Sequence, residues 1–352
     1  MTKLVVLGVR AALVGLAASR LARVARAAPP LTAGGRAPAD VTVVVPARDE
    51  AARIWPCVSA LVADGADVLV VDDGSTDATR AVAEQAGARV VAAGPLPDGW
   101  AGKAHALEVG LRAATTATVV FVDADTRPAP GFVSAAAGAL DGATLVTLAA
   151  RVDAASTGER WLHPSMLTTL VHRLGPPGVA ARRPARTMAS GQCMVVDRTA
   201  LVAAGGLEPV RDALLEDLAL ARHLAAESHE VRFLDGTAVL DVEGYGSLAA
   251  TWGGWGRSLD LAPVTGPAWQ LLDLAVVWSA LGLPLPRMLA RRGDVVDVVA
   301  LALRIGALVG TASAYRRRGL PYWLSPLADP AVAARITVGT LRPSRRWRGR
   351  RY

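Results

Sequence analysis

The chain has 352 residues, which is enough for one large catalytic domain with appended segments. Hydrophobic residues make up 52% of it, a high share for a water-soluble enzyme, and its net charge is +7. The apolar excess lies before residue 30 and after residue 262, whereas the middle has the composition of an ordinary α/β domain. No nucleic-acid-binding motif accompanies the basic charge, so the composition argues against nucleic acid as a partner and favours a membrane surface.

The first 30 residues contain an apolar run, Leu4 to Ala18, which only Arg10 interrupts. A cleaved signal peptide is one interpretation, because Ala25-Arg26-Ala27 resembles a cleavage site. The arginines that follow the run oppose translocation and hold that side in the cytoplasm; they are Arg20, Arg23 and Arg26. The run is short for a spanning helix. We therefore expect residues 1–30 to form a signal anchor or an interfacial helix.

Residues 41–122 alternate between strand and helix patterns. Short apolar and β-branched runs predict strands at residues 41–45, 68–71, 89–92 and 118–122. Helical spacing predicts helices at residues 51–63, 77–85 and 103–114, the second of them capped by Ser75 or Thr76. Strands that alternate with helices predict an α/β fold with a mostly parallel central sheet, covered on both faces.

Charged clusters follow three of these predicted strands. They are Arg48-Asp49-Glu50, Asp72-Asp73 and Asp123-Ala124-Asp125. Such sheets bind ligands at the carboxyl ends of their strands, so the clusters mark a candidate site. Neither a P-loop nor a G-x-G-x-x-G motif follows the first strand, which argues against an ATP or dinucleotide site of those kinds.

Asp123 and Asp125 stand two residues apart at a strand end, where they can converge on one hard cation. Mg²⁺ or Mn²⁺ bound in this way keeps waters and takes oxygens from a substrate diphosphate. Lys103 follows Gly102 at a predicted helix N-terminus, where the helix dipole favours a phosphate. Taken alone, the acidic pair could be any acidic turn and Lys103 a solvated surface residue.

Glu216 and Asp217 lie inside an apolar helical pattern, Leu214 to Leu218. Burial raises the pKa of a carboxylate, which suits a general base, but acids are also common in the first turn of a helix. The residues alone leave both interpretations open. Residues 161–186, rich in Pro and Arg, also keep three interpretations: an acceptor-binding flap, a membrane-facing loop or an ordinary surface insertion.

Residues 265–352 hold two further apolar segments and a basic tail. Residues 269–289 contain Asp273, and residues 295–314 contain Asp297 and Arg304. Each segment is near the lower length limit for a spanning helix and contains at least one charged side chain, which costs free energy to place inside a bilayer. If both crossed the membrane, the arginines between them would lie outside, against the usual bias. Membrane association is expected, and the sequence leaves open whether these helices span.

Cys57 and Cys193 lie in different apolar settings, without a CxxC motif or a paired histidine. The five histidines are scattered, with no metal-ligand spacing. This pattern predicts two buried thiols and neither a disulfide framework nor a zinc site.

Six stretches, taken in order, resemble the family 2 glycosyltransferases, which have the GT-A fold. They read VVVPARDEAARI, VLVVDDGSTDAT, LPDGWAGKAHALEVG, VVFVDADTRPAPGFV, GQCMVVDRTALVAAGG and LLEDLALARHL. The resemblance covers Val41 to Leu259 and is nearest to membrane-associated members that glycosylate carotenoids, hopanoids and related lipids, whose W-x-G-R-x-Y ending is similar to Trp347–Tyr352. It implies a GT-A domain at residues 41–260, between an N-terminal anchor at 1–30 and C-terminal membrane-associated helices with a basic tail at 265–352.

The resemblance also implies roles for single residues. Asp217 would be the base that deprotonates the acceptor, with Glu216 beside it. Asp123 and Asp125 would hold the divalent metal, Asp125 more directly. A nucleoside pocket would be lined by Pro46, Ala47, Arg48 and Glu50. Asp73 would bind the base, Lys103 would approach the diphosphate, and the sugar pocket would be shaped by Gly191, Gln192 and Gly206. The segment that closes over the donor or the acceptor would contain Trp252, Trp255 and Arg257.

The chain departs from the family pattern at several positions. Asp49 and Glu108 stand where Asn is common, and Leu207 where His is frequent. Trp255-Gly256-Arg257 is not the Q-x-x-R-W of processive synthases, which argues for transfer of a single sugar. The other departures concern the identity of the donor more than the class of reaction.

The implied function is inverting, metal-dependent transfer of one hexose from a nucleotide sugar, of the UDP-glucose type, to a lipid or isoprenoid hydroxyl. The enzyme would act in the cell membrane with its catalytic domain on the cytoplasmic side. Two alternatives are a polyprenyl-phosphate sugar synthase, which differs only in its acceptor, and a non-catalytic membrane scaffold with the same fold. A sugar-nucleotide pyrophosphorylase would need a Gly-rich loop with Arg and Lys where this chain has Pro46 to Glu50.

Overall fold

The computed structural model describes residues 2–342, 346–347 and 350–351, with Thr2, Arg257 and the residues after 342 as backbone only. Its contacts form two compact units. The sheet unit holds residues 28–151, 180–243 and 345–352, and the helical unit holds residues 1–27, 152–179 and 244–344. The domains expected from the sequence, at residues 1–30, 41–260 and 265–352, have different boundaries from these two units, and that division stays a prediction.

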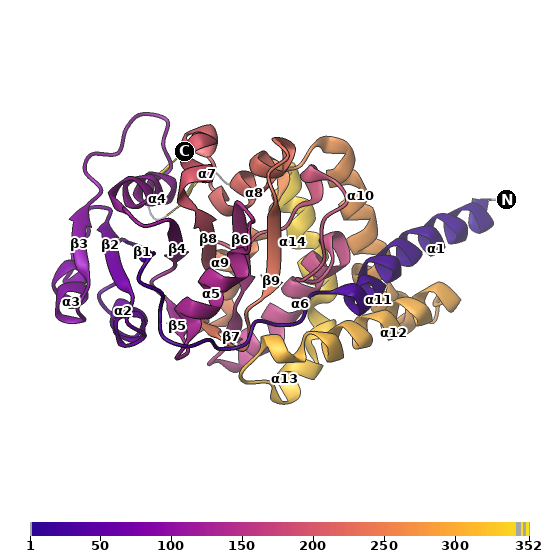
Figure 1. The fold of residues 1–352 in the computed structure, drawn as a ribbon. Helices are drawn as coiled ribbons and strands as arrows, with labels where there is room; N and C mark the ends of the chain where they lie inside the picture. The colour runs from indigo at the N-terminus through magenta and orange to yellow at the C-terminus, as the bar shows by residue number, and fades with distance from the viewer. Residues whose placement is uncertain (1, 343–345, 348–349, 352) are drawn as a thin grey trace. The chain divides into compact units, whose positions relative to one another are not determined.

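A seven-stranded sheet forms the centre of the sheet unit, in the order β3-β2-β1-β4-β8-β6-β9 (Figure 1). Only β8 runs antiparallel to its neighbours, β4 and β6. The mostly parallel α/β sheet is therefore confirmed. Its strands are β1 (Val41–Ala47), β2 (Asp67–Asp72), β3 (Arg89–Ala92), β4 (Thr118–Val122), β6 (Leu145–Ala149), β8 (Cys193–Asp197) and β9 (Val231–Asp235).

The helices of the sheet unit agree with the sequence pattern in number and order up to residue 122. They are α2 (Ile54–Ala63), α3 (Thr79–Gln85), α4 (Gly102–Ala113), α5 (Phe132–Leu140), α7 (Arg198–Ala203) and α8 (Glu216–Ala226), with short 3₁₀ turns at Pro184–Arg186 and Glu208–Val210. A short strand, β5 (Thr126–Pro128), pairs antiparallel with β10 (Leu240–Glu243). β7 (Arg151–Asp153) stands where the chain first passes from the sheet unit to the helical unit, and β11 (Arg346–Trp347) pairs with β12 (Arg350–Arg351).

The core of the sheet unit explains why these runs form strands. Val43, Val44 and Val45 follow one another in β1 and are all fully buried, so both faces of the strand are covered. Helix α4 covers β1 and β2 closely because Gly110 has no side chain. A Cβ added at Gly110 would lie 2.3 Å from a methyl group of Val44. The close contact fixes the height of α4, which carries Lys103 at its first turn.

The helical unit is built from the N-terminal helix, one internal helix and the helices of the C-terminal part of the chain. Its helices are α1 (Thr2–Leu21), α6 (Thr157–Leu174), α9 (Leu248–Ser258), α10 (Pro267–Val277), α11 (Pro284–Leu289), α12 (Val295–Gly310), α13 (Gly319–Trp323) and α14 (Asp329–Leu341). Shorter turns lie at Ala22–Arg26, Ala262–Val264, Trp278–Gly282, Ala312–Ala314 and Ser325–Ala328. Of residues 161–186, those up to 174 belong to α6, which Ser156 caps and which is largely buried, so the loop and surface-insertion interpretations are wrong for this part. The acceptor-binding interpretation stays a prediction.

Among the described residues, one helical stretch is long and apolar enough to cross a membrane, at residues 3–26, with a mean hydropathy of 1.8. The expected segment at residues 269–289 is divided into α10, a π-helical turn and α11. The segment at residues 295–314 is helical only to Gly310 before a 3₁₀ turn follows. Neither C-terminal segment therefore forms one long spanning helix.

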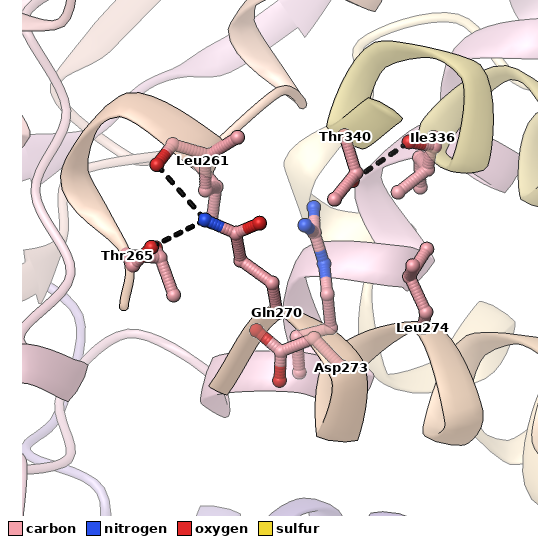
Figure 2. Close-up of a pocket in the computed structure, with 9 residues that line it drawn as sticks. Leu261, Thr265, Gln270, Asp273, Leu274, Ile336 and Thr340 are labelled. Atoms are coloured by element: carbon pink, nitrogen blue, oxygen red, sulfur yellow. Dashed lines mark hydrogen bonds between the residues drawn. The ribbon is translucent and has the colours of Figure 1, made fainter. Parts of the chain in front are cut away.

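The interior of the helical unit is unusually polar. Arg304 of α12 and Asp329 of α14 are almost fully buried and form an ion pair at 2.7 Å, and Ser165 of α6 donates to the same carboxylate at 2.6 Å. A small pocket nearby is lined partly by Arg173, Gln270 and Asp273 (Figure 2). Buried polar groups require partners, and the Asp329 carboxylate receives them from α6 and α12.

Replacing Gly110 tests the packing of α4 on the sheet. Gly110→Ala should lower the unfolding free energy of the sheet unit by roughly 1–3 kcal/mol, because its methyl group would overlap Val44. Gly138→Ala is the matched control: this exposed glycine of α5 has nothing within 4 Å, so alanine there should be neutral or slightly stabilising. Thermal unfolding of both variants measures the difference. Equal melting temperatures would contradict the close contact.

Candidate active site

Lys103 lies at the centre of a charged cluster in the sheet unit. Its Nζ lies 2.8 Å from Asp123 Oδ1 and 3.1 Å from Glu216 Oε1. The three side chains come from the start of α4, the end of β4 and the start of α8. Burial disfavours the charged amine, but Asp123 and Glu216 outweigh it and raise the pKa of Lys103. The lysine is therefore a held cation and not a solvated surface residue.

The turn after β4 is built to present its two acids. The Asp123 N–H donates to the carbonyl of Gln192 at 3.1 Å, and the Asp123 carbonyl accepts the Thr126 hydroxyl at 2.8 Å. The thiol of Cys57 lies beneath the turn, 3.6 Å from the same carbonyl and 3.4 Å from the Thr126 hydroxyl. Both cysteines are buried and free, as the sequence predicts.

The surroundings of Asp125 disfavour its ionised form, and a bound cation would stabilise that form. Burial, and then the negative charge of Asp123, raise the pKa of Asp125 to about 6. Arg53 counteracts this effect, whereas Glu50 adds to it, so the loop after β1 lies close enough to act on the acidic pair. The influence of Arg53 was not predicted, because nothing in the sequence marks this arginine apart from others.

The two acids at the start of α8 differ in their surroundings. Glu216 is buried, and that burial raises its pKa to about 7 even though Lys103 lowers it. Asp217 is half-buried and lies beside Gly191. A Cβ added at Gly191 would lie 3.2 Å from Asp217 Oδ2 and 3.1 Å from Lys103 Nζ. The acids occupy a first helical turn, as one sequence interpretation holds, and the general-base role of the other interpretation stays a prediction.

The loops after β1 and β2 are joined to one another. Arg48 donates to the carbonyl of Asp73 at 3.2 Å and to its carboxylate at 3.3 Å. The Glu50 N–H donates to the Thr79 hydroxyl at 2.8 Å. Pro46 and Ala47 are the last residues of β1, in register with the end of β2. The structure thus brings the predicted nucleoside-pocket residues to one edge of the sheet.

The expected capping role of Ser75 and Thr76 is wrong. Helix α3 begins at Thr79, and its N-cap position is Ala78. The Thr76 N–H instead donates to Asp49 at 2.8 Å, and the Ser75 hydroxyl accepts the Asp49 N–H at 3.0 Å. Asp49 has a φ of 52°, a left-handed conformation that Asp and Asn tolerate better than most residues. This conformation accounts for Asp at a position where Asn is common in similar proteins.

Gly206, a predicted sugar-pocket residue, packs directly against Glu108 of α4. Its φ is 62°, and an added Cβ would lie 2.5 Å from the Glu108 carboxylate. That carboxylate accepts the Leu207 N–H at 2.8 Å and pairs with Arg112 at 2.7 Å. Glu108 therefore holds the loop after α7. The sequence shows Glu108 as a departure from the family pattern without showing this contact.

The predicted closing segment lies in the helical unit, on α9. Trp255 stacks on His163 with ring centroids 3.8 Å apart, and His163 bonds to the Tyr315 hydroxyl at 2.8 Å. The guanidinium of Arg335 lies 6.0 Å from the ring of Trp252. The side chains of Arg257 and of the terminal Trp347–Tyr352 motif lie outside what the structure describes. The roles assigned to these residues stay predictions.

The acidic residues also bear on the predicted divalent metal. Among the residues that the structure describes, no three His, Cys, Asp or Glu side chains are grouped to hold a metal ion. A cation on Asp123 and Asp125 would therefore complete its shell with water and substrate oxygens, as Mg²⁺ commonly does. The raised pKa of Asp125 is consistent with this, because a bound cation reverses the effect of neighbouring acids.

Comparison with known proteins supports the resemblance seen in the sequence. Residues 42–203 match the family model described as "Glycosyl transferase family 2". A curated relative, 4,4'-diaponeurosporenoate glycosyltransferase of Staphylococcus aureus (strain MRSA252), is 42% identical over 88 residues, which is 24% of this chain and 24% of that protein. The matching stretch therefore spans about a quarter of that relative's length.

One solved structure shows the same fold. A mannosyltransferase from Pyrobaculum calidifontis, solved in complex with GDP-Man and Mn²⁺, has a TM-score of 0.55 at 21% identity, over 97% of this chain and 99% of that chain. Glucosyl-3-phosphoglycerate synthase from Mycobacterium tuberculosis is 30% identical, over 60% of this chain and 73% of that chain, with a TM-score of 0.38. With the order of the sheet and the charged strand ends, these findings show that residues 42–203 form the domain of a family 2 glycosyltransferase of the GT-A fold, similar to that of carotenoid glycosyltransferases.

Proposed function

We propose that the chain is an inverting glycosyltransferase that moves one hexose from a nucleotide sugar, of the UDP-glucose type, to a lipid or isoprenoid hydroxyl at the cytoplasmic face of the cell membrane. The observation that carries this proposal is the Lys103 ammonium held between Asp123 and Glu216, with Asp217 beside Gly191. The cluster joins a cation for a diphosphate, acids for a metal and a half-buried base.

Transfer then needs one displacement. The acceptor oxygen attacks the anomeric carbon while the bond from that carbon to the diphosphate oxygen breaks, and the bonding electron pair leaves with the nucleoside diphosphate. The Lys103 ammonium counters the negative charge that grows on the leaving group. Asp217 takes the proton that the acceptor hydroxyl loses. Attack from the face opposite the leaving group inverts the anomeric centre without a covalent intermediate.

Asp217 suits the role of base better than Glu216 does. The Glu216 carboxylate is buried and paired with Lys103 at 3.1 Å, so its partner is the lysine. Asp217 is more exposed and lies against Gly191, whose missing side chain leaves room beside Lys103. Glu216 would therefore position Lys103, and Asp217 would meet the acceptor.

Asp123 and Asp125 would hold Mg²⁺ or Mn²⁺. When bound, such an ion neutralises diphosphate charge and orients the leaving group. The ion pair between Asp123 and Lys103 then has a second use, because it places the ammonium next to the acids that would hold the metal. Both positive charges would act on the same diphosphate.

A polyprenyl-phosphate sugar synthase remains an alternative that differs in the acceptor. The name of the curated relative favours an isoprenoid acceptor, since that protein acts on a diaponeurosporenoate. A non-catalytic scaffold fits the structure less well. Partly buried acids held around one lysine are more typical of a catalytic site than of a scaffold.

The direct test is to incubate membranes that contain the protein with labelled UDP-glucose, UDP-galactose or GDP-mannose and to analyse the extracted lipid. We expect transfer from UDP-glucose that EDTA abolishes and Mg²⁺ or Mn²⁺ restores. Transfer only to added polyprenyl phosphate would favour the synthase alternative. No transfer from any donor would overturn the proposal.

Asp217→Asn should lower kcat by about 10²- to 10⁴-fold, because the amide cannot accept the acceptor's proton. The loss should appear in kcat with little change in the KM for the donor. Asp212→Asn is the matched control, since Asp212 is an exposed acid on the segment that leads into α8. Steady-state kinetics of both variants measure the effect. Full activity in the Asp217 variant would exclude it as the base.

The raised pKa of Glu216 predicts how the stability of the sheet unit depends on pH. Its pKa is about 7 in the folded state and near the ordinary glutamate value of 4.5 in the unfolded state, so the folded state binds more protons between these values. The contribution of Glu216 to stability should therefore fall as the pH rises from about 4.5 to 7. Glu216→Gln should flatten this slope in melting temperatures measured across that range. An unchanged slope would contradict the assignment.

A further inference from the structure

The helical unit carries charged side chains inside and apolar side chains outside. In α12 the only charged residues, Asp297 and Arg304, are 0% and 1% exposed. The residues on its outer face are all apolar, and the larger ones are 46% to 69% exposed: Val295, Val298, Val299, Ile305 and Val309. A helix that faces water shows the reverse arrangement.

Helix α1 repeats this arrangement. Its arginines within and just after the apolar run, Arg10 and Arg20, are buried. Between Lys3, which is exposed, and Arg10, its exposed large residues are apolar and are 53% to 74% exposed: Leu4, Val5, Val6 and Val9. In the sheet unit, Trp55 is the only comparable exposed apolar side chain among the described residues. The apolar exterior is therefore a property of the helical unit.

The charges turned inward are paired with one another. Arg10 binds both Asp294, at 2.7 Å, and the fully buried Asp297. Arg287 of α11 binds the same two carboxylates at 2.9 and 3.0 Å. Two arginines and two aspartates thus cancel at the junction of α1, α11 and α12. Ionisable residues within membrane-embedded helices face the interior of the bundle and pair in this manner.

The outer faces of α1 and α12 belong to one surface. Val14 and Ala17 of α1 pack with Val296 and Ala300 of α12 in one buried cluster. Figure 1 shows the two helices side by side, with α11 next to them. A shallow apolar groove runs between them, lined by Ala11, Val14, Gly15, Ala18, Val295, Val296 and Val299. Exposed apolar side chains that gather on one face mark an interaction site.

Arginines stand at both ends of α12. Arg291 and Arg292 precede it, and Arg316 and Arg318 follow it, all of them exposed. The helix has 16 residues and is therefore about 24 Å long, shorter than the roughly 30 Å of a hydrocarbon core. Both basic ends can meet anionic headgroups of one leaflet only if the helix lies in the plane of the membrane.

We propose that the outer faces of α1 and α12 form a docking surface for an anionic lipid bilayer. The two helices lie in the plane of the membrane interface and do not cross the bilayer. The Arg10–Asp297 pair joins the two helices so that they dock together. The in-plane arrangement has no outer loop, so the arginines between the C-terminal apolar segments no longer conflict with the positive-inside bias. The inference adds a membrane orientation to the proposed function and is tested without any activity.

Single engineered cysteines can report on the docking surface, because the native Cys57 and Cys193 are fully buried. Val299→Cys and Leu4→Cys place a probe on the surface, and Trp55→Cys is the exposed apolar control in the sheet unit. Each full-length variant carries a polarity-sensitive fluorophore and is mixed with vesicles of phosphatidylcholine alone or with phosphatidylserine. We expect a blue shift and quenching by brominated lipid at residues 4 and 299 but not at residue 55, and more strongly with phosphatidylserine.

Three outcomes would overturn the proposal. Unchanged spectra at residues 4 and 299 would exclude lipid docking. A shift that depends on protein concentration without vesicles would assign the surface to a second copy of the chain. Reaction of an unlabelled Leu4→Cys variant with an impermeant thiol reagent enclosed in the vesicle lumen would show that α1 crosses the membrane.

Arg10→Leu separates a docked α1 from an independent spanning helix. A spanning helix would gain membrane affinity from the loss of a charge, with no effect on the melting temperature. A docked helix would leave Asp297 buried with one partner fewer, so the melting temperature of the full chain should fall. Arg10→Leu combined with Asp297→Asn should recover part of that loss. Stronger membrane retention with an unchanged melting temperature would overturn the pairing.

Discussion

The Lys103 ammonium contacts two carboxylates that are brought to it by separate parts of the sheet unit. Asp123 reaches it from the end of a central strand, and Glu216 from the first turn of α8. The height of α4, set by the close approach of Gly110 to Val44, determines where the amine stands. If the lysine were absent, two acids would face each other in a partly buried space, so the packing of the sheet and the charge of the site depend on the same contact.

The strands and the order of the charged clusters could be predicted because they are local patterns. β3 and β4 begin and end at the residues that the sequence predicts. The capping residues could not be placed, because Ser75 and Thr76 bond across to Asp49, on a different loop. The contact between Glu108 and Gly206 joins positions about a hundred residues apart. A single sequence records neither pairing.

Helix α6 shows why other parts of the fold could not be predicted from the sequence. Its residues include two histidines, several hydroxyl groups and an internal proline, and this composition is typical of a loop at the surface. Some of their polar groups have partners elsewhere in the helical unit, such as Tyr315 for His163 and Asp329 for Ser165. The amphipathic period that identifies a helix is lost when its inner face is polar. The same inversion made α1 and α12 appear to be charged, imperfect spanning segments.

The thiol beneath the acidic turn has a further consequence. Burial raises the pKa of Cys57 to about 12, so the thiolate that reacts with electrophiles is almost absent while the turn is closed. Its hydrogen-bond partners are the Asp123 carbonyl and the Thr126 hydroxyl, which also shape the turn that presents the acids. Reaction of this cysteine therefore requires the turn to open. The rate of that reaction therefore reports how often the turn after β4 opens locally. A ligand that binds Asp123 and Asp125 and holds the turn closed should slow the reaction.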